Sequence, residues 1–191
     1  MEKRAPRRAG RPRSEPARLA VLAAALEIAA RDGPQKLSMD AIARRAGVSK
    51  DTLYRWWPSK TEVILEALSE RGQETIPLPD TGSLAGDLGG FLRATVASAD
   101  LATQALLRAI AAEAASHPDM AMIIRDRFLV GRRNALTRIL QRAVSRGELR
   151  QEEVELTVDL VYGSLWYRLI FGVGSVDSDW ATNVTNLVAG A

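Results

Sequence analysis

Two short helical segments separated by only three residues constrain the fold of this chain more than any other feature. Ser38 is a favourable N-cap for a helix over 39–46, and Ser49 is one for a second helix that runs through Trp57. Gly47 follows the first helix, where a tight turn requires a left-handed backbone conformation that glycine adopts at little steric cost. Two helices joined by so short a turn have the geometry of a helix-turn-helix.

Elsewhere the apolar residues also recur at helical spacing, and we find no convincing strand-like alternation. Ser59 and Glu62 have the spacing of a capping box, which opens a helix that ends near Arg71. Glycine, proline and capping residues place the ends of the other helices. The expected helices cover about 15–31, 39–46, 50–57, 60–71, 84–99, 101–116, 119–146, 153–171 and 178–189.

We therefore predict an all-α protein in three parts. Residues 1–13 form a basic arm that is too polar to fold alone. Residues 14–75 form an N-terminal three-helix domain, with its helix-turn-helix at about 38–57. Residues 84–191 form a C-terminal helical bundle.

Charge is divided unevenly along the chain. Residues 1–60 contain 14 basic against 6 acidic residues, a net charge of +8, whereas residues 61–191 contain 12 against 17, a net charge of −5. Such a division is typical of a module that binds a polyanion, joined to a body that does not. The basic flanks and the turn chemistry favour DNA binding by the helix-turn-helix over an ordinary helical hairpin. In the arm, the segment 7–13 resembles an AT-hook core, in which Gly10-Arg11-Pro12 lies extended along a narrow minor groove. Arg11 and Arg13 can then enter A·T-rich DNA, with a nonspecific basic tail as the alternative.

The chain has no cysteine and only one histidine, His117. Disulfides, thiol nucleophiles, cysteine-based zinc sites and multi-histidine metal centres are therefore excluded. His117 precedes Pro118 at a helix junction and is interpreted as a turn residue, so we expect no catalytic residue, no metal and no cofactor. Charged residues interrupt the apolar stretch 154–173, so we expect no membrane span and a cytoplasmic protein.

The segment from Leu37 to Lys60 resembles the signature of tetracycline-repressor (TetR) family transcription regulators. That signature begins with a small residue, Gly, Val and Ser, in this order. Thr, Leu or Ile, Tyr, an aromatic residue and Lys then follow, and the same order occurs here. The resemblance covers about residues 18–65, and the rest of the chain agrees only in the layout of its helices. Trp56 departs from the pattern, because histidine is frequent at that position. The resemblance implies a transcription regulator, usually a repressor, that binds double-stranded DNA as a homodimer.

A helical wheel of residues 50–57 places Leu53, Trp56 and Trp57 towards the protein. The residues that lie away from it are Asp51, Thr52, Tyr54 and Arg55, with Lys50 at the border. Outward cations can pair with guanine in the major groove, and the methyl group of Thr52 can pack on a thymine methyl. The predicted DNA-contacting residues are Arg11, Arg13, Arg44, Ser49, Lys50, Asp51, Thr52, Tyr54, Arg55 and Lys60.

Some of these residues have alternative roles. The family resemblance implies phosphate contacts for Tyr54 and Lys60. For Asp51 the alternative is a favourable interaction with the helix dipole. For Arg44 and Arg55 the alternative is a solvated surface charge.

The helix expected at 153–171 carries two apolar stripes, so most of its circumference is hydrophobic. Such a helix suits two partners, its own domain and a second subunit, with burial inside one subunit as the alternative. Together with the last helix it resembles the four-helix dimer interface of the TetR family. The predicted dimerisation residues are Val158, Val161, Leu165, Leu169, Trp180, Val184 and Leu187. The other stripe consists of Leu156, Leu160, Tyr167 and Phe171.

The family resemblance also implies that the protein leaves DNA when a small-molecule effector enters the C-terminal bundle. Large or adaptable side chains on the bundle helices are the candidates for that pocket, with ordinary core packing as the alternative for each. These candidates are Met122, Phe128, Tyr162 and Trp166.

We therefore predict a sequence-specific repressor that binds an inverted-repeat operator as a homodimer and is released by a small molecule. The alternative within DNA binding is a regulator whose C-terminal domain recruits a protein partner without sensing a ligand. A helical-bundle enzyme and a membrane-surface protein are the alternatives from other classes, and the lack of a catalytic constellation disfavours the enzyme.

Overall fold

The computed structural model describes residues 14–190, which form helices and connecting loops without any strand. The α-helices are α1 (Glu15–Asp32), α2 (Met39–Ala46), α3 (Lys50–Trp56), α4 (Lys60–Thr75), α5 (Leu84–Ser98), α6 (Leu101–Ser116), α7 (Pro118–Ile124), α8 (Val130–Ser145), α9 (Val154–Phe171) and α10 (Ser178–Ala189). Three short turns of other helix types are η1 (Pro34–Lys36), η2 (Arg125–Leu129) and η3 (Gln151–Glu153). The prediction of an all-α protein is confirmed for this part of the chain.

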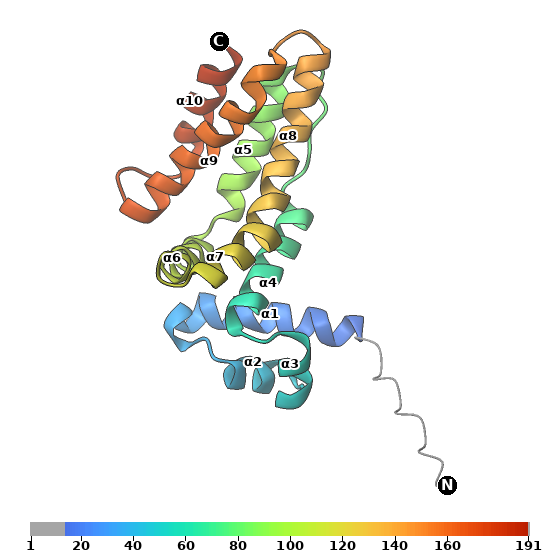
Figure 1. Cartoon of the computed structure of the whole chain (residues 1–191), viewed down its shortest axis with the longest axis vertical. Helices are drawn as coiled ribbons and strands as arrows, with labels where there is room; N and C mark the ends of the chain where they lie inside the picture. Colours follow the sequence, from blue (N-terminus) through green and yellow to red (C-terminus); the bar gives the residue numbers. More distant parts are fainter. Residues whose placement is uncertain (1–13, 191) are drawn as a thin grey trace, which may run out of the picture.

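The helices are arranged in a head and a body (Figure 1). The head consists of α1, α2 and α3 at one end of the molecule, and α4 leads from it into the body. In the body, α5 packs against α8 and α10, and α8 packs against α9. The helices α6 and α7 lie across the junction between the two parts. This arrangement leaves α3 on the side of the head that faces away from the body.

Two hydrophobic cores hold this arrangement together. The first joins α1–α4 to α6 and α7, and the second fills the space between α5, α8, α9 and α10. Leu53 and Trp57 are fully buried in the first core, as predicted. The Trp57 indole Nε1 donates a hydrogen bond to Oε2 of Glu66 at 2.7 Å, and its ring meets Trp56 edge to face at 5.6 Å. The polar atom of this buried indole is therefore satisfied.

Most predicted helix ends agree with the structure within one or two residues, and three details differ. First, α4 continues past Arg71 to Thr75, because a glycine at position 72 is tolerated inside a helix that packing stabilises. Second, the predicted helix 119–146 contains a π-helical turn, η2. Third, only half of the expected capping box forms: the Ser59 hydroxyl accepts from the Glu62 amide at 3.3 Å, but the Glu62 carboxylate pairs with Arg127.

The loop between α4 and α5 is fastened by one fully buried carboxylate, Asp87. Its Oδ1 accepts hydrogen bonds from the Thr81 amide and, at 2.8 Å, from the Thr81 hydroxyl. Its Oδ2 accepts from Nη2 of Arg146 at 3.2 Å. Burial by itself raises the pKa of Asp87, but these hydrogen bonds and the nearby cation outweigh it, so the pKa lies below the ordinary value.

This depressed pKa predicts an acid-dependent loss of stability. Because the pKa of Asp87 is lower in the folded state than in the unfolded chain, the carboxylate stabilises the fold above about pH 4. That contribution is lost as the pH falls from there through the folded-state pKa. We expect Asp87→Asn to lower the free energy of unfolding in urea at pH 7 by about 1–3 kcal/mol. The variant should also lose less stability than the wild type between pH 5 and pH 3.

The matched control is Asp126→Asn, which removes an exposed carboxylate on η2. We expect little change in stability from this substitution, because exposed ion pairs contribute little. A pH profile of Asp87→Asn that parallels the wild-type profile would show that the carboxylate is not a source of the acid dependence.

Candidate nucleic-acid interface and body cavities

The turn between α2 and α3 is formed by the residues that the sequence analysis identified. The Ser38 hydroxyl accepts from the amide of Ala41 at 3.1 Å, and the Ser49 hydroxyl accepts from the amide of Thr52 at 3.2 Å. Gly47 has φ 67° and ψ 28°, in the left-handed region, and its amide bonds to the carbonyl of Ala43. The two caps and the glycine together fix the angle at which α3 leaves α2.

The third helix has a buried inner face and an exposed outer face. Leu53 on the inner face is inaccessible to solvent, and Trp57 closes the same side. The side chains of Lys50, Asp51, Tyr54 and Arg55 are all exposed, and Tyr54 exposes 51% of its surface. The predicted division of this helix into two faces is therefore confirmed. Contact of the outer residues with DNA stays a prediction.

Thr52 and Ser49 interact with each other at the start of α3. The Ser49 hydroxyl donates to Oγ1 of Thr52 at 2.8 Å, while it accepts from the amide of the same residue. A serine hydroxyl has one proton, so Ser49 has none left to offer a phosphate in this arrangement. Thr52 is half-buried.

The cations around the turn differ in how they are engaged. Lys50 pairs with Asp40 at 2.7 Å, and both side chains are well exposed, so the pair is weak and easily exchanged for a phosphate. Lys60 lies 3.5 Å from the carbonyl of Leu37 through its Nζ. Arg44 is exposed and forms no ion pair with any residue between 14 and 190. The predicted residues Arg11 and Arg13 lie outside the described residues.

The head is linked to the body through the first turn of α4, which follows α3 directly. The almost buried Glu62 pairs with Arg127 of η2. The neighbouring Thr61 donates a hydrogen bond to Oε2 of Glu113 on α6 at 2.7 Å. These two contacts couple η2 and α6 to α4, the helix that joins the head to the body.

Most of the predicted dimerisation residues are buried within one subunit, and their role in dimerisation stays a prediction. Five of them already lie in the cores of a single subunit, namely Val158, Val161, Leu165, Leu169 and Trp180, and Val184 is half-buried. Only Leu187 of the predicted set is exposed. The exposed apolar side chains on these two helices, which we call the α9–α10 stripe, are Leu156, Leu160, Tyr167, Ile170, Phe171 and Leu187.

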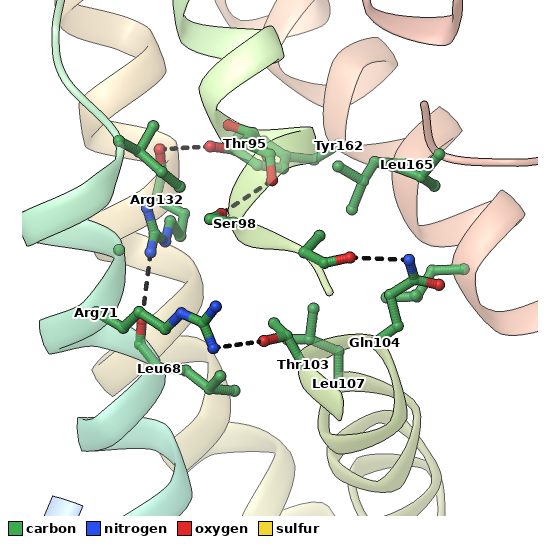
Figure 2. Close-up of a pocket in the computed structure, with 15 residues that line it drawn as sticks. Leu68, Arg71, Thr95, Ser98, Thr103, Gln104, Leu107, Arg132, Tyr162 and Leu165 are labelled. Atoms are coloured by element: carbon green, nitrogen blue, oxygen red, sulfur yellow. Dashed lines mark hydrogen bonds between the residues drawn. The ribbon is translucent and has the colours of Figure 1, made fainter. Parts of the chain in front are cut away.

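Two adjoining cavities of the body share lining residues, and the smaller one also borders α4. The smaller has a volume of about 70 Å³, and Figure 2 shows ten of its lining residues by name, among them Tyr162. The larger has a volume of about 310 Å³, and its lining includes Phe128, Tyr162 and Trp166, whose contact with a ligand stays a prediction. Met122 lines neither cavity and exposes 49% of its surface on α7, and its role in ligand binding stays a prediction.

The sequence analysis did not identify Arg132, which lines both cavities. Its guanidinium donates to the carbonyl of Leu68 at 3.3 Å, and Tyr162 donates to the Arg132 carbonyl at 2.8 Å. Burial lowers the pKa of Arg132 from its ordinary value and raises the pKa of Tyr162 to about 12. Tyr162 is therefore a neutral phenol at physiological pH, and Arg132 brings a positive charge to the cavities.

Within residues 14–190, no helix is long and apolar enough to cross a membrane. Over the same residues, no group of histidine and acidic side chains has an arrangement that could hold a metal ion.

Comparison with known families gives two matches that together cover most of the chain. Residues 21–67 match the family described as bacterial regulatory proteins, tetR family. Residues 78–188 match the family described as tetracyclin repressor-like, C-terminal domain. The first match contains the helix-turn-helix. The second contains the whole lining of the larger cavity, and that of the smaller cavity apart from Leu68, Arg71, Gly72 and Ile76.

Individual relatives agree with these matches. The HTH-type transcriptional regulator YdeS of Bacillus subtilis (strain 168) is 31% identical over 178 residues, 92% of this chain and 89% of the relative. The DNA-binding transcriptional repressor TetR of Mycobacteroides abscessus is 42% identical over 77 residues, 40% of each chain. The crystal structure of the TetR family transcription regulator SCO0332 has a TM-score of 0.81 at 31% identity, and the superposition covers 93% of this chain and 99% of that one.

Proposed function

Since the chain belongs to the TetR family of helix-turn-helix transcriptional regulators, we propose that it is a repressor that binds an inverted-repeat operator as a homodimer. The observation that carries this proposal is the outer face of α3, where Lys50, Tyr54 and Arg55 are exposed opposite a fully buried Leu53. A helix with such a face fits the major groove, which is about 12 Å wide. The assignment as a repressor is supported by the 42% identity over 77 residues to the M. abscessus repressor.

The head and the body have different functions in this proposal. We assign DNA binding to residues 14–75, and dimerisation and effector binding to residues 84–191, with the boundary in the loop that Asp87 fastens. One helix-turn-helix makes few base contacts, so two of them are needed for a specific operator. The α9–α10 stripe supports dimerisation, because six large apolar side chains are exposed on these two helices and such exposure is typical of interaction surfaces.

Release by a small molecule is supported by the two body cavities. The smaller one lies against α4, which connects it to the head, and the walls of both are mainly apolar with a few polar groups. That composition is typical of ligand sites. An effector that binds the DNA-incompetent arrangement more tightly lowers operator affinity, with a coupling free energy of typically about 1–3 kcal/mol.

Selection of bound duplexes from a random pool tests the proposal. We expect an enriched inverted repeat, with half-site centres about 34–36 Å apart or a multiple of that spacing, because two symmetric heads read it. Repeating the selection at several salt concentrations separates specific binding from phosphate attraction, which weakens steeply as salt rises. No enriched sequence at any ionic strength would overturn the assignment of α3 as a reading helix.

A further inference from the structure

The guanidinium of Arg132 has no anionic partner inside the body. Among residues 14–190, no carboxylate lies within ion-pair distance of it. Its neighbours are the backbone carbonyl of Leu68 at 3.3 Å and the ring of Phe128, whose centre lies 5.8 Å away. A half-buried cation with only a carbonyl and a ring beside it is poorly compensated.

A glycine on α4 makes room for this charge. A Cβ atom placed on Gly72 would lie only 1.1 Å from Nη2 of Arg132. The guanidinium therefore lies directly against the backbone of α4, in space that any larger residue would occupy. Four residues earlier on the same helix, Leu68 provides the carbonyl that the guanidinium contacts.

The neighbouring arginine in the cavity is different. Figure 2 shows the Arg71 and Arg132 side chains on the same side of the smaller cavity, with Arg71 directed to Thr103 and Arg132 to Leu68. Arg71 also pairs with Asp100 at 2.8 Å, so its charge is balanced. Arg132 brings the uncompensated positive charge to this cavity.

The apolar part of the site adjoins the same arginine. Arg132 and Tyr162 line both cavities, and so do the side chains of Leu107 and Leu165. The larger cavity, of about 310 Å³, also has Trp166 in its wall. This volume is at the lower end of the range of about 300–1,000 Å³ that is usual for small-molecule sites.

We infer that the effector is a small organic acid, whose carboxylate pairs with the Arg132 guanidinium and whose apolar body occupies the cavity beside Leu165 and Trp166. This inference depends on the proposed function, because it names the class of molecule that releases the operator. The planar fork of an arginine matches the two oxygens of a carboxylate, and a single negative charge balances the cation that, among residues 14–190, has no carboxylate partner in the cavity. A neutral ligand leaves that cation uncompensated.

Pairing of the carboxylate with Arg132 can also affect the position of the head. A carboxylate competes with the Leu68 carbonyl for the guanidinium, so binding of the acid changes the contact between α8 and α4. The first turn of α4 follows α3 directly and is fixed to the body through Glu62 and Arg127. The position of α4 therefore links the acid site with the outer face of α3.

The test compares organic acids with their neutral primary amides on the full-length protein. The probes are butanoate, octanoate, decanoate, benzoate and phenylacetate, each measured by isothermal titration calorimetry beside its amide. We expect at least one acid to bind about tenfold or more tightly than its amide, because a hydrogen bond to a charged group is stronger than one to a neutral group. The same acid should weaken binding to the selected operator duplex.

Variants assign the preference to one side chain. Arg132→Met should remove the preference for the acid, about tenfold or more, and leave the amide within about twofold. The matched control is Arg133→Met, which removes a neighbouring arginine of the larger cavity whose charge is balanced by Asp159. That control should keep the preference. Circular dichroism establishes that both variants are folded, and the comparison on the wild-type protein is decisive even if Arg132→Met does not fold.

Three outcomes would overturn the inference. In the first, no acid binds more tightly than its amide; in the second, folded Arg132→Met keeps the preference. In the third, an acid binds at Arg132 but leaves operator affinity unchanged, so it is not the effector. All three differ from a failure of the proposed function, in which the protein without any ligand selects no operator.

Discussion

The double substitution Leu160→Asp and Phe171→Asp should yield a monomer that binds the operator at least about a hundredfold more weakly than the wild type. Both side chains belong to the α9–α10 stripe and expose 56% and 70% of their surfaces. In a two-fold symmetric interface each new carboxylate meets apolar side chains or its own copy, and burial of an unpaired charge is costly. Linking two heads raises avidity by about 10²–10⁴, and a monomer loses that gain.

Sedimentation velocity at micromolar concentration measures the subunit number, and titration of the selected duplex measures the affinity. The matched control is Leu101→Asp, because this leucine of α6 exposes 81% of its surface and lies outside the stripe. The control should remain a dimer with wild-type affinity. If the double variant sediments as a dimer, the stripe is not the interface, and another surface must bring the two heads together.

The α9–α10 stripe also shows what the sequence alone does not predict. A helical wheel finds two apolar stripes on α9 but cannot decide which one meets the rest of its own subunit. That choice is made by contacts with α5, α8 and α10, which buried the stripe of Val158 and Val161 and left Leu160 and Phe171 outside. Because both stripes have similar hydrophobicity, only the tertiary arrangement separates them.

By contrast, the local features of the head could be predicted residue by residue. A serine cap depends on an amide three positions away, and a left-handed turn depends on one glycine, so Ser38, Gly47 and Ser49 act within a few residues of the chain. The inward position of Leu53 also follows from local spacing.

The central residue of the acid site lacked any such local signal. Arg132 and Gly72 are 60 positions apart in the sequence, and neither attracts notice alone. An arginine on an amphipathic helix usually points to solvent, and a glycine within a helix usually suggests a weak point. Their contact becomes evident only in the fold, where the Arg132 guanidinium occupies the space that a side chain at Gly72 would fill. Chemistry that depends on distant pairs of residues therefore requires the structure.

Substitutions on the outer face of α3 should also weaken operator binding strongly. Tyr54→Ala should weaken binding to the selected operator about a hundredfold, because each of two half-sites loses a contact and a single lost contact costs about 1–3 kcal/mol. Thr52→Ala should also weaken it, by a smaller amount, because this side chain is half-buried and its hydroxyl is bonded to Ser49. Neither substitution removes a residue of the core, so both variants should melt close to the wild-type temperature.

Fluorescence anisotropy with the selected duplex and with an unrelated duplex of equal length separates the two contributions to affinity. Tyr54→Phe keeps the ring and removes only the hydroxyl, so it reports whether the phenolic oxygen binds a phosphate. Arg125→Ala is the control for surface substitution, since this exposed arginine belongs to η2 in the body. If Tyr54→Ala and Thr52→Ala both retain wild-type affinity for the operator, DNA is read by another face. The role of α3 would then be structural, as the helix that packs Leu53 into the core.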